Sequence, residues 1–201
     1  MIKIKIISSN IGYAANTYLI IADNQCAVID PSADFNSEDL EGTELKYILL
    51  THAHFDHFLE IESWIKNSSA KVIVSENDRE ALSDSHRNCY ALFMYKDNGY
   101  NGDASTVKDG DTLSLGNEEI EVWGVPGHTP GSLMFKVENH TFVGDLAFEG
   151  GGYGRFDLPG GDARALVDSL KKLLKFDDNT MLYPGHGPKT SIKEYRKHLQ
   201  I

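Results

Sequence analysis

Short apolar runs separated by polar breaks dominate the chain, and most of them predict β-strands. Near the start, β-rich runs cover residues 2–7, 16–22 and 26–29, with brief polar interruptions between them. This spacing predicts a β-meander. A weak helix or turn over residues 35–40 follows, and the uninterrupted apolar run 47–50 predicts a buried strand.

The middle of the chain changes period. Apolar residues recur at helical spacing over residues 58–66, which predicts a helix, and a strand over 71–74 and a second helix over 77–85 follow. From residue 84 to residue 105 the periodicity fails, although the segment is rich in aromatic residues. We expect it to pack on the core as a helix-turn piece, to overhang a pocket and shape substrate access, or to do both.

The second half is again rich in predicted strands. They cover residues 112–115, 120–125, 132–137, 141–143 and 180–183. A glycine-rich break over 149–154 precedes a helix over 163–175, which has one apolar face and Asp162 as its N-cap. A closing helix covers 191–199. Two strand-rich halves with helices between them predict two packed sheets with helices outside, an α/β layered domain that spans residues 1–201.

Composition narrows the possible functions. The chain has 201 residues, 41% of them hydrophobic, which suffices for one sizeable core. Its net charge of −11 argues against a nucleic-acid partner, because phosphates are held by clustered lysine and arginine. No apolar stretch approaches the roughly 20 residues needed to span a bilayer, and the N-terminus resembles a strand and no signal peptide. With two cysteines and no disulfide framework, we expect a cytoplasmic protein that acts on a small molecule, and the oligomeric state stays open.

Several predicted strands are followed directly by a side chain that can bind a metal ion. Three histidines and an aspartate occur within residues 52–57, directly after the strand 47–50. His128, Asp145 and His186 follow later strands, and the histidines end two identical Pro-Gly-His tripeptides. Loops that leave one edge of a layered β core can bring such residues together. The pattern therefore predicts one metal centre made of His52, His54, Asp56, His57, His128, Asp145 and His186.

The spacing divides these residues between two ions. His52 and His54 point to the same side of an extended chain and would form a three-nitrogen site with His128. Asp56 and His57 are directed elsewhere and would serve a second ion with His186, whereas Asp145 has two oxygens and can bridge both. We expect two divalent ions, zinc in the first place, with iron or manganese as alternatives. Each ion would keep an open position for water, as in catalytic sites.

Other polar residues have simpler explanations. His86, His140 and His198 stand outside the pattern and are interpreted as structural or exposed. Asp30 follows a strand end, so it either supports a ligating imidazole or forms an Asp-Pro turn, and Thr51 has the same two interpretations.

These motifs resemble those of the metallo-β-lactamase fold superfamily. The similarity rests on His-x-His-x-Asp-His at 52–57, Pro-Gly-His-Thr-Pro-Gly at 126–131, Gly-Asp at 144–145 and Gly-His-Gly at 185–187. It covers nearly the whole chain and implies an αββα sandwich. Residues 154–162 further resemble the Gly-Arg-x-Asp-x-Pro-Gly-Gly segment of hydroxyacylglutathione hydrolase (glyoxalase II)-like proteins. A structural alternative for this segment is an Arg155–Asp157 ion pair followed by a glycine turn.

The chain departs from that branch in two places. Glu60 stands where the family often has glycine, three positions after the cluster. The sequence ends soon after the last motif, at Ile201, and lacks the helical C-terminal domain that supplies much of the glutathione-binding surface in true glyoxalase II enzymes.

We therefore predict a metal-dependent hydrolase in which a metal-bridged hydroxide attacks a thioester or other ester or lactone carbonyl, with Asp56 orienting the hydroxide or carrying its proton. The resemblance also leaves room for a mononuclear iron persulfide dioxygenase of the same fold, and for a metal-binding protein without catalysis.

Overall fold

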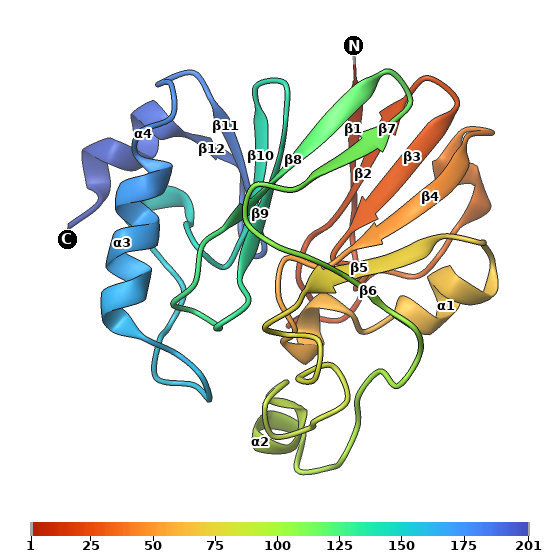
Figure 1. Ribbon diagram of the computed structural model, residues 1–201, viewed down its shortest axis with the longest axis horizontal. Helices are drawn as coiled ribbons and strands as arrows, with labels where there is room; N and C mark the ends of the chain where they lie inside the picture. Colours follow the sequence, from red (N-terminus) through yellow and green to blue (C-terminus); the bar gives the residue numbers. More distant parts are fainter. Residues whose placement is uncertain (1, 201) are drawn as a thin grey trace.

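Two six-stranded sheets form the centre of the molecule in the computed structural model, which describes residues 2–200 (Figure 1). The two terminal residues of the predicted domain 1–201 lie outside the described range. The first sheet has the order β1-β2-β3-β4-β5-β6, and the second has the order β12-β11-β10-β9-β8-β7. Each sheet therefore takes its strands from one part of the sequence, as the two strand-rich halves predict.

The first sheet begins with an antiparallel meander and continues in parallel. Its strands are β1 Lys3–Ile7, β2 Thr17–Ala22, β3 Gln25–Ile29, β4 Glu44–Leu49, β5 Lys71–Ser75 and β6 Ser105–Val107. Strands β3, β4, β5 and β6 pair in parallel. A short 3₁₀ helix, Ser37–Leu40, lies in the connection between β3 and β4, where the sequence predicts a weak helix or turn.

The second sheet is mostly antiparallel. Its strands are β7 Thr112–Leu115, β8 Glu118–Gly124, β9 Leu133–Val137, β10 His140–Gly144, β11 Met181–Pro184 and β12 Thr190–Ser191. Only β10 and β11 pair in parallel. The connection between them contains a 3₁₀ turn, Glu149–Gly151, and the helix α3, Ala163–Leu173.

Helices cover the outer faces of both sheets. Helix α1, Ile61–Lys66, lies outside the first sheet, whereas α3 and α4, Ile192–His198, lie outside the second (Figure 1). The predicted N-cap of α3 is in place, because the Asp162 carboxylate accepts hydrogen bonds from the amides of Arg164 and Ala165. The observed layers are those of the αββα sandwich.

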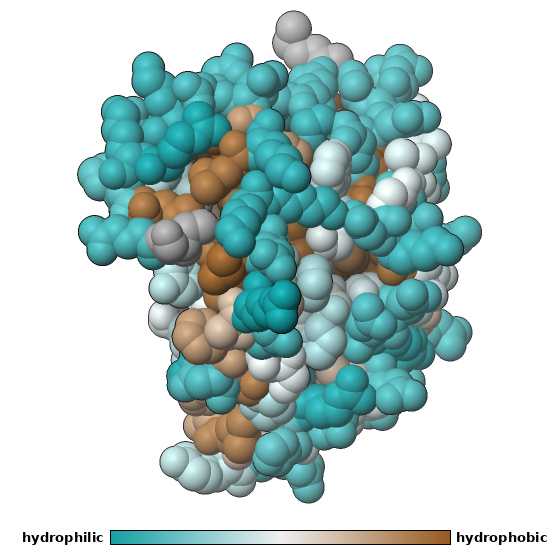
Figure 2. Space-filling model, turned by 60° about the vertical axis from the view of Figure 1, so that its left-hand side comes forward, coloured by the Kyte–Doolittle hydropathy of each residue, from teal (hydrophilic) through white to brown (hydrophobic). Residues whose placement is uncertain are grey.

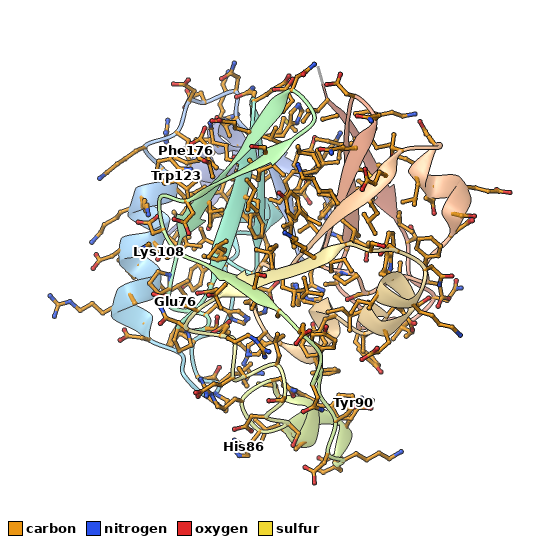
Figure 3. All side chains as sticks on the ribbon, turned by 45° about the vertical axis from the view of Figure 1, so that its right-hand side comes forward. Glu76, His86, Tyr90, Lys108, Trp123 and Phe176 are labelled. Atoms are coloured by element: carbon orange, nitrogen blue, oxygen red, sulfur yellow. The ribbon has the colours of Figure 1, made fainter. Side chains whose placement is uncertain are left out.

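The alternation of side chains along the strands explains these layers. In β2, Tyr18 and Ile20 belong to the core between the sheets, whereas Leu19 and Ile21 belong to the core outside the first sheet. Successive side chains of a strand point to opposite faces, so a strand covered on both sides must be apolar throughout. On the outer side of the second sheet, the Trp123 ring meets Phe176 at 5.0 Å between centroids (Figure 3).

The structure differs from the local predictions in three places. Residues 77–85 form successive turns and no helix, because the polar groups of this segment bind distant loops. The helix predicted over 58–66 begins only at Ile61, and residues 55–57 form a 3₁₀ turn before it. The short strands β6 and β12 were not predicted, because two or three residues carry no readable period.

No helix among residues 2–200 combines the length and the apolar character needed to cross a membrane.

Candidate metal centre

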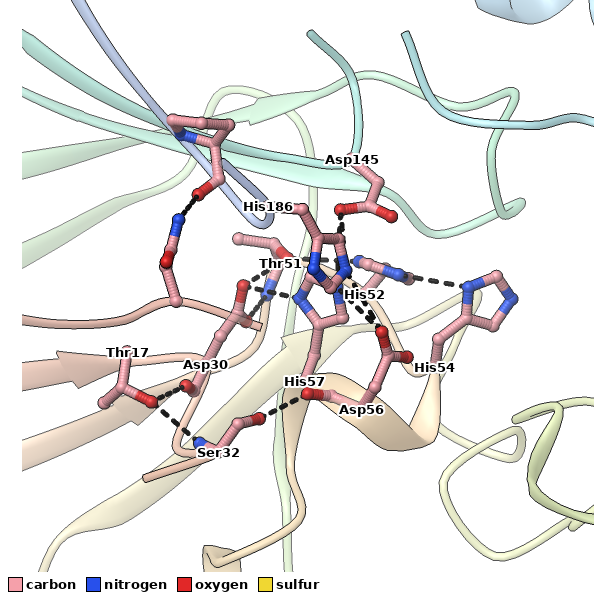
Figure 4. Close-up of polar contacts among 12 residues, drawn as sticks. Thr17, Asp30, Ser32, Thr51, His52, His54, Asp56, His57, Asp145 and His186 are labelled. Carbon is pink, nitrogen blue, oxygen red and sulfur yellow. Dashed lines mark hydrogen bonds and ion pairs between the residues drawn. The ribbon is translucent and has the colours of Figure 1, made fainter. Parts of the chain in front are cut away.

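The predicted ligands lie where strands of both sheets end at a common edge. Strand β4 leads into the 52–57 cluster, β8 precedes the loop with His128, β10 precedes Asp145, and β11 precedes His186. Hydrogen bonds join these loops across the sheets, since Leu133 N donates to Thr51 O over 2.7 Å. The structure thus brings all seven predicted residues to one place. Figure 4 shows six of them, His52, His54, Asp56, His57, Asp145 and His186.

Three buried imidazoles face one another in the first group. The Nε2 atom of His52, the Nδ1 atom of His54 and the Nε2 atom of His128 lie 3.2, 2.9 and 3.2 Å apart. Tetrahedral zinc with Zn–N bonds of 2.0–2.1 Å requires nitrogen separations of about 3.3–3.4 Å. The three nitrogens are therefore close to the spacing of one face of such a site.

Burial keeps two of these imidazoles, those of His52 and His54, neutral. It lowers the pKa of His52 well below its ordinary value, and it lowers the pKa of His54 to about 3, with a further contribution from the neighbouring His128. A neutral imidazole has a lone pair to offer, so a metal ion meets no competing proton at neutral pH.

The second group combines carboxylates with imidazoles. Asp56 Oδ2 lies 3.1 Å from His186 Nε2 and 4.0 Å from His57 Nε2. Burial lowers the pKa of His57, but the carboxylates of Asp30 and Asp145 outweigh it and raise that pKa well above its ordinary value. Unlike His52 and His54, His57 is therefore surrounded by negative charge in the described structure.

Asp145 lies between the two groups and turns one oxygen to each. Its Oδ1 atom is 3.4 Å from His57 Nε2, and its Oδ2 atom is 3.5 Å from His128 Nε2. Within the described residues, His57 Nε2 and Asp145 Oδ1 are buried without a hydrogen-bond partner. Buried polar atoms normally have partners, and these two face the position that a metal ion would take. The donor set therefore fits two divalent ions.

Asp30 fixes the orientation of two imidazoles. Its Oδ2 atom accepts hydrogen bonds from His57 Nδ1 and from the Thr51 hydroxyl, both over 2.8 Å, and its Oδ1 atom accepts one from the Thr51 amide. The Thr51 oxygen can then accept from His52 Nδ1 at 3.1 Å. Both rings thereby present Nε2 to the centre. The predicted support of an imidazole is thus observed for Asp30 and Thr51, and the Ser32 amide also donates to the Asp30 carbonyl across Pro31 over 2.8 Å.

The segment that resembles the glyoxalase II-like motif supports the centre through its backbone. The Arg155 carbonyl accepts a hydrogen bond from His128 Nδ1 over 2.6 Å, and Gly154 N donates to Asp145 O over 2.8 Å. A Cβ atom at Gly154 would overlap that same Asp145 oxygen. The predicted ion pair is also present, because the Arg155 guanidinium donates twice to the Asp157 carboxylate over 2.7 Å.

A buried aspartate that was not among the predicted site residues ties two loops together. Asp78 accepts hydrogen bonds from the Ala53 amide, the Thr129 hydroxyl and the Gly131 amide. Asp78 thereby joins the 52–57 cluster to the loop of His128. A signal was available, since Asp78 stands three residues after the end of β5, as His52 does after β4, but the expected helix over 77–85 concealed it.

The remaining histidines lie outside the centre. His140 Nδ1 contacts the Tyr183 hydroxyl at 3.0 Å, and His86 and His198 are exposed. None of them belongs to a potential metal-binding group within residues 2–200.

Five of the predicted ligands line a cavity of about 550 Å³, namely His54, Asp56, His128, Asp145 and His186. One part of its wall comes from the helix α2, Tyr90–Met94, which lies in the segment 84–105. Figure 3 places Tyr90 and His86 at the end of the molecule where this segment projects. The segment packs on the core, because Cys89 and Tyr100 are buried there, and it also borders the cavity through Phe93 and Met94. Its effect on substrate access stays a prediction.

Comparisons with known proteins agree with this geometry. The profile described as "Metallo-beta-lactamase superfamily" matches residues 11–186. The probable metallo-hydrolase YqgX of Bacillus subtilis is 33% identical over 192 residues, which cover 89% of this chain and 87% of the relative. The hydroxyacylglutathione hydrolase GloC of Haemophilus influenzae is 31% identical over 204 residues, with coverages of 92% and 91%.

Solved structures show the same architecture. The B3 metallo-beta-lactamase BLEG-1 superimposes with a TM-score of 0.88 at 29% identity, over 98% of this chain and 97% of that one. The protein TTHA1623, solved in a di-iron-bound form, gives a TM-score of 0.81 at 29% identity, with coverages of 96% and 98%.

Proposed function

The chain belongs to the metallo-beta-lactamase superfamily, and we propose that it is a dinuclear metal-dependent hydrolase that cleaves the thioester, or another ester or lactone bond, of a small molecule. The placement of Asp145 carries the proposal, since this buried carboxylate turns one oxygen to each of two potential metal-binding groups. A relative named as a hydroxyacylglutathione hydrolase supports the thioester.

The metal ions would be held by His52, His54 and His128 on one side, by Asp56, His57 and His186 on the other, and by Asp145 between them. Bound there, two divalent ions would supply a water of lowered pKa and stabilise negative charge on the carbonyl oxygen. Histidine and carboxylate donors suit zinc, iron and manganese, and the di-iron form of TTHA1623 keeps iron beside zinc as a candidate.

The protein's own residues prepare this chemistry. Asp30, Thr51 and the Arg155 carbonyl fix the imidazoles by hydrogen bonds, so the donor atoms need little reorganisation. Asp56 lines the cavity and keeps 21% of its side chain exposed, so its free oxygen can take a proton from a water in the cavity.

We also propose a small-molecule substrate and a cytoplasmic location, as the sequence predicts. The substrate is a small molecule, because the cavity has the volume of a small-ligand site and the chain carries a net charge of −11. Cys26 and Cys89 are buried, free thiols, which supports a cytoplasmic location.

Metal analysis combined with hydrolysis assays tests the proposal. We expect two ions per chain by elemental analysis, hydrolysis of members of a thioester, ester and lactone panel, and loss of activity after chelation. Oxygen consumption with a persulfide by iron-loaded protein holding one ion per chain would instead favour the dioxygenase. Full metal occupancy without turnover on any substrate would favour a metal-binding protein without catalysis.

A further inference from the structure

Given the proposed hydrolase function, we infer that the substrate is a neutral thioester or ester with an extended apolar acyl chain, which the cavity holds against an aromatic wall of Tyr13, Phe55 and Phe93.

The aromatic wall is continuous. The Phe55 ring lies 5.8 Å from the Tyr13 ring and 6.3 Å from the Phe93 ring, between centroids. Phe55 directly precedes Asp56, so the wall begins beside the predicted metal centre. Tyr13 and Phe93 are 46% and 48% exposed, which leaves large apolar surfaces open toward the cavity mouth. A bound apolar chain would remove this surface from water.

The rest of the cavity continues the apolar character. Met94 and Leu158 line it, and Phe148 lies on the side of His186, with 6.3 Å between the rings. The surface coloured by hydropathy shows apolar residues at the lower end of the molecule, the end at which α2 lies (Figure 2). A cavity of about 550 Å³ is within the range of about 300–1,000 Å³ for drug-sized ligands and is larger than a two- or three-carbon acyl group needs.

The cavity offers little to a charged substrate. Among the described residues that line it, Arg155 is the only lysine or arginine. Its guanidinium is already engaged by both oxygens of Asp157 at 2.7 Å. A substrate with carboxylates, as glutathione has, would enter an acidic protein and meet no unpaired lysine or arginine in the described lining of the cavity.

The wall is held in place before any ligand binds. The buried Asn88 side chain donates to the carbonyls of Leu82 and Asn98 and accepts from the Tyr90 amide. The Asn88 carbonyl accepts from Phe55 N over 2.9 Å, so α2 is tied directly to the loop of the metal centre. A preformed wall lowers the ordering cost of binding.

A chain-length series tests the inference. We expect kcat/KM for straight-chain acyl thioesters of one neutral thiol to rise up to about fourfold for each methylene from acetyl to hexanoyl, the equivalent of ~0.8 kcal/mol per buried CH₂. The value for S-lactoylglutathione should lie below that of the hexanoyl thioester. A flat series, or a preference for S-lactoylglutathione, would overturn the inference and leave the hydrolase function standing.

Two variants and a binding assay distinguish apolar binding at the aromatic wall from hydrolysis at the predicted metal centre. Phe93→Ala should flatten the series, whereas Leu92→Ala, on the same helix but outside the cavity lining, should leave it unchanged. Calorimetric binding of hydrolysis-resistant alkyl thioethers to metal-free protein should strengthen with chain length and weaken in Phe93→Ala. Such binding without any hydrolysis by the metal-loaded protein would support the apolar site and refute the proposed hydrolase function. Binding independent of chain length would refute the apolar site.

Discussion

Single buried side chains hold the loops of the metal centre in register. Asp30 and Asp78 each use both carboxylate oxygens to accept hydrogen bonds from loops that follow strands. Such contacts cost more when broken than they contribute when formed, because the abandoned donors stay buried. The architecture of the site is therefore sensitive to residues that would never touch the substrate.

Replacing Asp78 tests this sensitivity. In Asp78→Asn an amide group would face the donors of Ala53 and Thr129, so at least one buried donor loses its acceptor. We expect the free energy of unfolding to fall by ~1–3 kcal/mol in urea titrations. Glu76→Gln, an exposed neighbour in the same turn, is the control and should match the parent protein. Equal stability of the two variants would show that Asp78 does not hold these loops.

Replacing Asp56 tests the proposed proton acceptor. Asp56→Asn keeps the shape of the side chain and one oxygen, but it removes the basic carboxylate next to His186. We expect kcat to fall by about 10²–10⁴-fold, the usual contribution of general base catalysis, while the circular dichroism spectrum stays the same. Elemental analysis accompanies the assay, because Asp56 is also a predicted ligand. Unchanged turnover at full metal occupancy would rule out this role.

At the scale of elements, strand ends made the site predictable. A buried strand is recognisable from its apolar run, and polar residues within a few positions of its end lie near the sheet edge, so all seven predicted ligands could be selected from the sequence. The turn over 77–85 and the role of the Arg155 carbonyl could not be predicted in this way. Tertiary hydrogen bonds decide the first, and a backbone group leaves no trace in residue identity.

Replacing Gly154 tests whether the segment that begins there supports the predicted ligands. A methyl group in Gly154→Ala would push against the Asp145 carbonyl and move both the predicted bridge and the carbonyl that holds His128. We expect a loss of ~1–3 kcal/mol in unfolding free energy and less than two ions bound per chain. Gly152→Ala is the matched control, because its nearest neighbour would lie at 3.4 Å and its φ of −68° suits alanine. Full metal binding by Gly154→Ala would refute the supporting role of this segment.

At the scale of the molecule, the metal centre lies where the two sheets meet. The 52–57 cluster follows β4 of the first sheet, whereas His128, Asp145 and His186 follow strands of the second. Without ions, the facing imidazoles and carboxylates bury atoms that have no partners, among them His57 Nε2 and Asp145 Oδ1 within the described chain. Bound ions would therefore join the two halves of the fold as well as supply chemistry.

Thermal unfolding measures how much bound ions stabilise the contact between the two sheets. A ligand that binds only the folded state stabilises it by RT ln(1 + [L]/Kd), about 2.7 kcal/mol at one hundred times Kd. For a chain of this size that corresponds to a rise in Tm of roughly 5–11 °C when zinc is returned to metal-stripped protein. His198→Gln, which changes an exposed histidine away from the centre, should respond in full. Asp145→Ala should respond much less, because it loses the group placed between the two sites. An equal rise in Asp145→Ala would mean that zinc stabilises the fold elsewhere and that the ions do not join the sheets through this carboxylate.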